Sequence, residues 1–108
     1  MAQNFRRYTS NAVGTSPATL VTANSYDTIV GISVSNIVGS TILADVYIND
    51  GSNDIYLVKS APIPSGGALQ ILAGGAKFVM QASDVLKVKS DTASSADVWV
   101  SAVDDIST

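Results

Sequence analysis

The sequence of 108 residues contains no cysteine, no histidine and no glutamate. The absence of cysteine excludes disulfides, thiolate chemistry and cysteine-based metal sites. The absence of histidine removes the commonest general base and the commonest transition-metal ligand. Only 14% of the residues are charged and the net charge is −3. Because phosphate binding needs clustered lysine and arginine, we expect no nucleic-acid partner.

The residues that remain offer little for catalysis. Fifteen serines are present, but none lies in a G-x-S-x-G elbow or an S-x-x-K pattern that would supply an activated nucleophile. A pair of carboxylates could serve a glycosidase, yet most of the nine aspartates fall in turns, where their side chains bond to the backbone. We therefore predict a protein that is not an enzyme, with no catalytic residues and no cofactor.

One segment invites a calcium interpretation. Asn49, Asp50, Asn53 and Asp54 place four oxygen-bearing side chains in six residues. An EF-hand loop needs a different glycine position and a distant glutamate, and the chain has no glutamate. A hairpin turn explains the same residues, so we favour the turn and predict no metal site.

No apolar run is long enough to span a bilayer, and no secretory signal follows the polar start of the chain. We expect no membrane partner and a chain made in the cytoplasm of its host and used as made.

What is abundant is the β-branched class. Thirteen valines, nine isoleucines and eight threonines stand against six leucines and two methionines. Their stiff χ1 angles suit a pleated sheet better than a helix. Apolar and small polar residues alternate over short runs separated by Asn, Asp, Gly, Ser and Pro. These runs predict strands at 18–23, 28–36, 42–49, 55–59, 69–72, 77–81, 85–90 and 98–102.

Strands at this spacing are typical of a small all-β domain. We predict an antiparallel β-sandwich, jelly-roll or Ig-like, with about seven to eight short strands. Residues 15–108 would form this single domain, and residues 1–14, which lack alternation, would form an extended N-terminal arm. The segment 61–67 contains two prolines and is expected to be a crossing loop. The predicted core is Val30, Ile32, Val34, Val46, Ile48, Leu86, Val88, Val98 and Val100.

Some aromatic residues fall outside this core pattern. Tyr47 and Trp99 alternate with core residues and so point to the opposite face. They either pack against a second layer or contact a partner, because Tyr and Trp are enriched at interfaces. The arm carries a basic and aromatic cluster that is suited to docking on a neighbour. The predicted interface residues are Phe5, Arg6, Arg7, Tyr8, Tyr47 and Trp99.

The N-terminal stretch MAQNFRRYTSNAVGTS and the segment from Pro62 to Asp105 resemble small virion structural proteins of tailed bacteriophages. The likeness lies in a succession of Pro-x-Pro, Gly-Gly, short strand, Gly turn, apolar strand and lysine-bearing strand. It brings no active-site residues. It implies a β-sandwich subunit added to a particle, either a decoration protein of the head or a component of the neck, tail or fibre.

Two functions of different class follow. The first is a capsid decoration or cement protein of the virion that oligomerises and docks on the major capsid protein or other virion proteins. The second is a tail- or fibre-associated module that binds carbohydrate or the host surface; a degenerate hydrolase is a distant third. A surface with so little charge favours a homo-oligomer. The resemblance, through the threefold positions of phage shells and fibres, makes a trimer the first expectation.

Overall fold

The computed structural model describes residues 4–23, 27–71 and 78–104, and these residues form strands and turns without a helix. The described part of the chain therefore contains no helix that is long and apolar enough to cross a membrane. Its strands are β1 (Asn4–Val13), β2 (Ala18–Thr22), β3 (Asp27–Asn36), β4 (Ile42–Asn49), β5 (Asp54–Ile63), β6 (Ala68–Ile71), β7 (Phe78–Met80), β8 (Val85–Ser90) and β9 (Ala96–Asp104).

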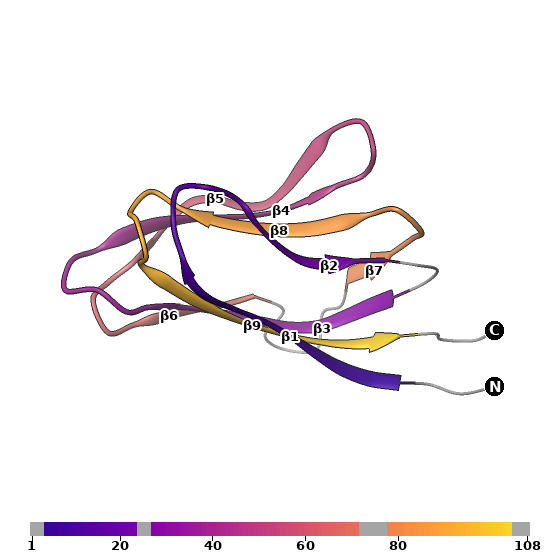
Figure 1. Cartoon of the computed structure of the whole chain (residues 1–108), viewed down its shortest axis with the longest axis horizontal. Coiled ribbons are helices and arrows are strands. Elements are labelled where there is room, and N and C mark those ends of the chain that lie inside the picture. The colour runs from indigo at the N-terminus through magenta and orange to yellow at the C-terminus, as the bar shows by residue number, and fades with distance from the viewer. Residues whose placement is uncertain (1–3, 24–26, 72–77, 105–108) are drawn as a thin grey trace.

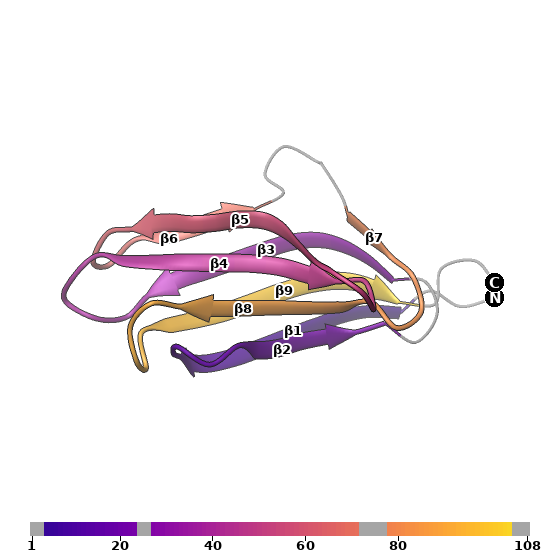
Figure 2. The same cartoon turned by 90° about the horizontal axis from the view of Figure 1, so that it is seen from above.

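The strands form two antiparallel sheets stacked in two layers (Figure 1). The first sheet has the order β1-β9-β3-β6, and β7 pairs with β3 on the same edge as β6. The second sheet has the order β2-β8-β4-β5. Seen from above, the two sheets overlap in matching order (Figure 2). The predicted antiparallel sandwich is confirmed.

The chain changes sheet at most of its connections. Only the β4–β5 and β6–β7 connections stay within one sheet, and each of the others crosses between the layers. β6 and β7 follow one another along one edge of β3 and together occupy the place of one long strand. Two four-membered sheets linked in this way are the jelly-roll arrangement, which is one of the two that the sequence predicts.

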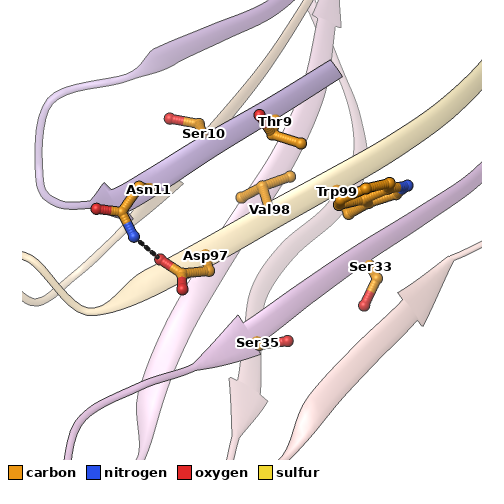
Figure 3. A pocket seen from close by; sticks show the side chains of 8 residues that line it. All are labelled: Thr9, Ser10, Asn11, Ser33, Ser35, Asp97, Val98 and Trp99. Carbon is orange, nitrogen blue, oxygen red and sulfur yellow. Dashed lines mark hydrogen bonds between the residues drawn. The ribbon is translucent and has the colours of Figure 1, made fainter. Parts of the chain in front are cut away.

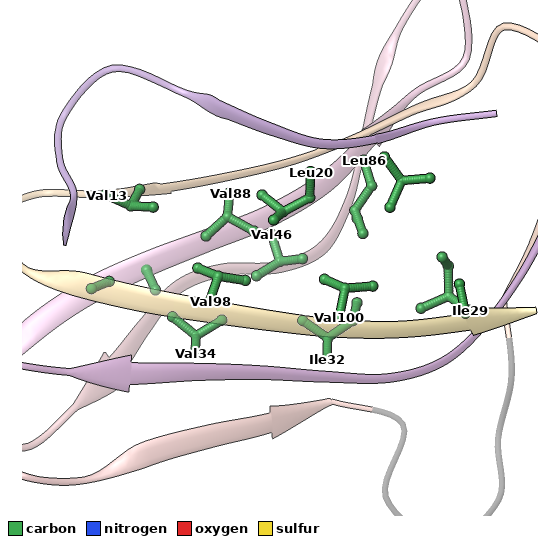
Figure 4. Packing of buried hydrophobic residues seen from close by; sticks show 14 of the residues in the cluster. Val13, Leu20, Ile29, Ile32, Val34, Val46, Leu86, Val88, Val98 and Val100 are labelled. Atoms are coloured by element: carbon green, nitrogen blue, oxygen red, sulfur yellow. The ribbon is translucent and has the colours of Figure 1, made fainter. Parts of the chain in front are cut away.

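The core lies between the sheets and consists of the inward-facing residues of both (Figure 4). Val98 and Val100 of β9 and Ile32 and Val34 of β3 face Val88 of β8 across the interior. Each of these side chains is almost fully buried, and burying one such aliphatic side chain stabilises the fold by about 1.5–3 kcal/mol. Eight of the nine predicted core residues pack in or against this cluster.

Val30 is the exception and its predicted burial is wrong. The register between β3 and β9 shifts between Ile29 and Gly31, so that Val30 is an extra residue in β3. Such a bulge reverses the face to which the following alternation points. Ile29 is therefore fully buried, whereas Val30 is 37% exposed on the outer face.

The predicted N-terminal arm is corrected for the residues that the structure describes. Asn4–Val13 form β1, an edge strand of the first sheet that pairs with β9 from Asn4 opposite Asp104 to Val13 opposite Ala96. Residues 1–3 lie outside the described part. The sequence hides this strand because its inward positions carry amphipathic side chains such as Arg6 and Tyr8 rather than aliphatic ones.

The predicted crossing loop also begins later than expected. β5 continues through Ala61 and Pro62 to Ile63, where Pro62 lies opposite Leu43 of β4. β5 is an edge strand, and an edge strand tolerates a proline whose missing N–H would point away from the sheet.

The buried side chain of Asn36 stabilises the connections between the layers through hydrogen bonds. The amide Nδ2 of Asn36 donates to the carbonyls of Ser40 and Ile63, at 2.7 and 2.9 Å, and its Oδ1 accepts from the N–H of Val38. One side chain thus ties the end of β3 to the end of β5. Asn36 is almost fully buried, so these bonds replace the water that it loses.

The β8–β9 turn is held against β4 by Asp91. The Oδ1 of Asp91 accepts from the N–H of Leu43 at 3.0 Å and from the hydroxyl of Thr92 at 3.0 Å, and its N–H donates to the carbonyl of Leu43. The bond from the Leu43 N–H, followed by that from Thr92, holds the pKa of the Asp91 carboxyl below its usual value of 3.8.

The two faces of β3 can be tested with one pair of substitutions. Ile32→Asp places an unpaired charge in the core and is expected to destabilise the fold by several kcal/mol, which is most of the stability of a small domain. Val30→Asp places the same charge in solvent at the bulge and is expected to leave a cooperative unfolding transition. Urea denaturation followed by circular dichroism measures both; unfolding of both variants would contradict the bulge.

The Asp91 carboxyl is expected to make stability depend on pH on the acid side. Its folded-state pKa is lowered, so its contribution is present above pH 3.8 and is lost as the pH falls through the folded-state value. Asp91→Asn removes this titration and should flatten the decrease in unfolding free energy below that pH. Urea titrations of both proteins across the acid range measure the slope; identical slopes would show that Asp91 is not responsible.

Candidate functional site

The outer face of the first sheet gathers three of the six predicted interface residues, Phe5, Arg7 and Trp99. Alternation along β9 sets this face, because Val98, Val100 and Ala102 point to the core. The residues of β9 that alternate with these three point outward, and they are Asp97, Trp99, Ser101 and Val103. Directly opposite residues of an antiparallel pair share a face, so β9 also fixes which residues of β1 and β3 point outward.

A row of three apolar residues and one threonine crosses this face near the chain termini. Phe5 of β1 lies opposite Val103 of β9, Val103 opposite Thr28 of β3, and Thr28 opposite Val79 of β7. We call these four residues the terminal row. Phe5 is 81% exposed and Val79 is 68% exposed, while Val30 adds further apolar surface beside them.

Arg7 and Trp99 lie further along the same face. Arg7 of β1 places its guanidinium carbon 5.5 Å from the centre of the Trp99 ring, a distance at which a cation is attracted to the face of an indole. Trp99 nevertheless remains 51% exposed. An indole held in place but open to solvent is a surface suited to contact with another molecule.

Beyond Trp99 the outer face becomes polar and is hollowed into a groove of about 370 Å³ (Figure 3). We call it the Trp99 groove. Side chains from β1, β9 and β3 line it, chiefly those of Thr9, Asn11, Ser33, Ser35, Asp97 and Trp99. In Figure 3 the indole is seen edge-on, with Thr9 and Ser33 on opposite sides of it.

Asp97 shapes this end of the groove by holding a bulge in β1. Asn11 and Ala12 are the two residues of β1 that lie between the pairs Ser10–Val98 and Val13–Ala96, where β9 has only Asp97. The Oδ1 of Asp97 accepts from the Nδ2 of Asn11 at 2.8 Å and from the N–H of Ala12 at 2.9 Å. Ala12 has a φ of 55°, a left-handed conformation that costs energy outside glycine. The carboxylate therefore stabilises a strained backbone and orients the Asn11 amide (Figure 3).

Alternation divides the predicted N-terminal cluster between the two faces of the first sheet. Phe5 and Arg7 point outward with Trp99. Arg6 lies opposite Ala102 and Tyr8 opposite Val100, so both belong to the inner side, where Tyr8 packs against the core. The structure brings three of the six predicted interface residues onto one face.

Tyr47 lies elsewhere, on the outer face of the second sheet. It is only 5% exposed, because Tyr56 of β5 packs against it with ring centres 4.9 Å apart. Lys59 in turn lies 4.4 Å from the centre of the Tyr56 ring. Burial, followed by the nearby Asp54 carboxylate, raises the pKa of the Tyr47 phenol. Within this chain Tyr56, rather than Tyr47, presents the aromatic surface of that face.

The acidic segment between β4 and β5 forms the predicted hairpin turn. The Oδ1 of Asp50 accepts from the N–H groups of Ser52 and Asn53, and the Nδ2 of Asn49 donates to Asp54. These bonds, the one from Asn53 foremost, lower the pKa of Asp50. Within residues 4–23, 27–71 and 78–104, no three acidic side chains are arranged to hold a metal ion.

Comparison with known proteins gives a likeness of fold. No family model matches the sequence, and no curated protein matches it. A pentameric capsid protein isolated from metagenomic phage sequences has a solved structure that matches 92% of this chain with a TM-score of 0.53 and 15% identity. A second crystal structure of a pentameric capsid protein from metagenomic phage sequences gives a TM-score of 0.47 and 17% identity over 92% of the chain. The chain spans 60% and 61% of the lengths of these two proteins. The first match shows that the jelly roll of this chain is a fold also used by a phage capsid protein.

Two substitutions can separate the effect of the hydrogen bonds that Asp97 accepts from the effect of its charge. Asp97→Ala removes both bonds to the bulge and is expected to destabilise β1 by about 1–3 kcal/mol. Asp97→Asn keeps an oxygen at Oδ1 and should lose much less. Hydrogen exchange at the N–H of Ala12 measures the effect, with much faster exchange in the alanine variant. Equal exchange in the two variants would mean that the bulge does not depend on this oxygen.

Proposed function

We propose that this protein is a structural subunit of a bacteriophage virion, most specifically a capsid decoration or cement protein, that associates with copies of itself and docks on the major capsid protein or other virion proteins. It acts without enzymatic chemistry or a cofactor. The outer face of the first sheet is the assembly surface, and the terminal row is its centre.

The terminal row carries the proposal. Large apolar side chains that are strongly exposed together on one face mark contacts with other proteins. Here Phe5 and Val79 stand at opposite ends of a row that crosses every strand of the sheet at that level. Arg7 and Trp99, of types enriched at protein interfaces, adjoin it. Contact with a second protein would remove this apolar surface from water.

The fold supports the same role. The jelly roll is shared with a pentameric phage capsid protein, which is itself a particle subunit. The sequence resemblance to small virion proteins points to a component added to a particle, and a low charge favours permanent burial against neighbours. A neck, tail or fibre location remains the alternative within the same class.

We propose that the copies associate into a closed ring, because in a closed ring every copy has its interface buried against a neighbour. The sequence favours a trimer through its family resemblance, whereas the structural neighbour is a pentamer. Both are rings in which each copy makes the same head-to-tail contact with the next, and the rotation between neighbouring copies determines their number.

Charged substitutions at the two ends of the terminal row test the proposal. The double variant Phe5→Asp with Val79→Asp places two charges in the assembly surface and is expected to convert the oligomer into an 11.1 kDa monomer. Both side chains are exposed, so the melting temperature of the fold should change little. Sedimentation velocity measures the molar mass, and labelling of purified particles with an antibody to this chain shows whether it is on the head or the tail.

The matched control is Leu43→Asp, because Leu43 is an exposed apolar residue of the second sheet. This variant should keep the wild-type oligomer. A wild-type protein that sediments as a monomer, or a double variant that remains oligomeric, would refute self-association through the terminal row. Purified particles without the chain would refute the virion role.

A further inference from the structure

We propose that the Trp99 groove is a binding site for a neutral saccharide, a mono- or disaccharide unit of a larger glycan. This goes beyond a structural role in the particle and rests on a different part of the same face. The observation that carries it is a half-exposed indole beside a hollow lined by hydroxyl, amide and carboxylate groups.

The size of the groove fits a small ligand. Its volume of about 370 Å³ lies within the range of about 300–1,000 Å³ that is usual for small-molecule sites. Residues of three adjacent strands line it, so its floor is a paired sheet rather than a flexible loop. A site on such a floor is formed before the ligand arrives and loses little entropy on binding.

Trp99 supplies the apolar contact that a pyranose needs. One side of a pyranose ring presents C–H groups, which are slightly positive, and the face of an indole is slightly negative. Arg7 lies against the ring and limits how the indole can turn. Figure 3 shows the indole edge-on, and the indole lines the hollow.

The remaining lining matches a polyol. Serine and threonine hydroxyls both donate and accept, as sugar hydroxyls do, and an amide adds two donors and an acceptor. The Asp97 carboxylate accepts through Oδ1 from β1, and the Asn11 amide is oriented by that bond. The Nε2 of Gln70 donates to the hydroxyl of Ser33 at 3.0 Å and so fixes another side of the groove. Groups fixed in this way give a sugar directional hydrogen bonds.

The charge of the groove excludes other ligands of similar size. Its lining, which lies wholly within the described residues, contains one carboxylate and no lysine or arginine. A phosphate group would meet the Asp97 carboxylate here, and Arg7, the cation beside the groove, is outside the lining with its guanidinium against the Trp99 ring. A purely apolar ligand would leave the polar side chains without bonds. A neutral, hydroxyl-rich ring satisfies both constraints.

The groove is also separate from the terminal row. Trp99 precedes Val103 by four residues along β9, which places the two about 13 Å apart at the usual rise of a strand. A subunit contact at the terminal row can therefore leave the polar end of the face open. A particle that carries many copies would then present many weak saccharide sites at once.

Trp99 is the only tryptophan in the chain, so its fluorescence reports on this groove alone. The wild-type protein is titrated with maltose, lactose, cellobiose and N,N′-diacetylchitobiose, and with glucose 6-phosphate as a charged probe. We expect at least one neutral disaccharide to give a saturable change in emission with a dissociation constant in the millimolar range or tighter. Glucose 6-phosphate should give none.

Three variants locate the site, with calorimetry as the readout where tryptophan is absent. Trp99→Ala should weaken binding by about tenfold or more, and Ser35→Ala, which shortens a lining side chain, by about threefold. Ser101→Ala is the matched control, because Ser101 is on the same outer face but outside the groove, and its affinity should be unchanged. All three positions lie on the outer face, and circular dichroism checks that the variants are folded.

Three results would overturn the proposal. One is the absence of a saturable change with every neutral disaccharide. Another is equal binding by wild type and Trp99→Ala, which would place the saccharide elsewhere. The third is tighter binding of glucose 6-phosphate than of the neutral sugars. None of these depends on the oligomeric state, so failure here is distinguishable from failure of the proposed assembly role.

Discussion

The pairing of β9 with β1 on one side and β3 on the other is the constraint on which the rest of the structure depends. Because side chains alternate along a strand, β9 at once contributes Val98 and Val100 to the core and Trp99 and Val103 to the surface. A slip of one residue in either pairing would exchange these sets. Core and surface are therefore determined by one register rather than by two independent choices.

The same register also determines that the outer face is apolar at one end and polar at the other. At the level of Val103 the neighbouring strands present Phe5 and Thr28, and at the level of Asp97 they present Asn11 and Ser35. One face thus has an apolar end and a polar end, with the indole between them. The two proposed contacts, with protein and with a saccharide, would therefore lie at opposite ends of one sheet.

Strand alternation made most of this fold predictable. Runs such as 42–49 and 85–90 alternate clearly, and their predicted bounds coincide with β4 and β8. The failures share a physical cause, which is that an edge or a bulge relaxes the demand for alternating apolar residues. β1 carries Arg6 and Tyr8 on its inner side because an edge strand is only half covered, and the extra residue Val30 shifts the pattern of β3 without leaving a mark in the sequence.

The candidate surface was predictable only in part. The sequence indicates Trp99 because it alternates with core residues, and Phe5 because it belongs to a basic and aromatic cluster. The sequence does not indicate Asp97 or Ser35, because short polar residues in a sequence with fifteen serines carry no individual signal and aspartates are typical of turns. The spacing of Asp97 and Trp99, two residues apart on one strand, is the only sign in the sequence that they share a face. Their partners in β1 and β3 come from segments more than sixty residues away, and only the strand order places them together.

The central place of β9 has a consequence for how the protein is made. β9 follows all of its partners in the chain, and it separates β1 from β3 in the first sheet. During synthesis the first sheet therefore lacks its middle member until β9 has left the ribosome, and a pairing of such long sequence separation forms slowly. Phe5 and Val103 come together only in that final step. A contact that needs both of these residues can therefore form only after β9 has paired with β1.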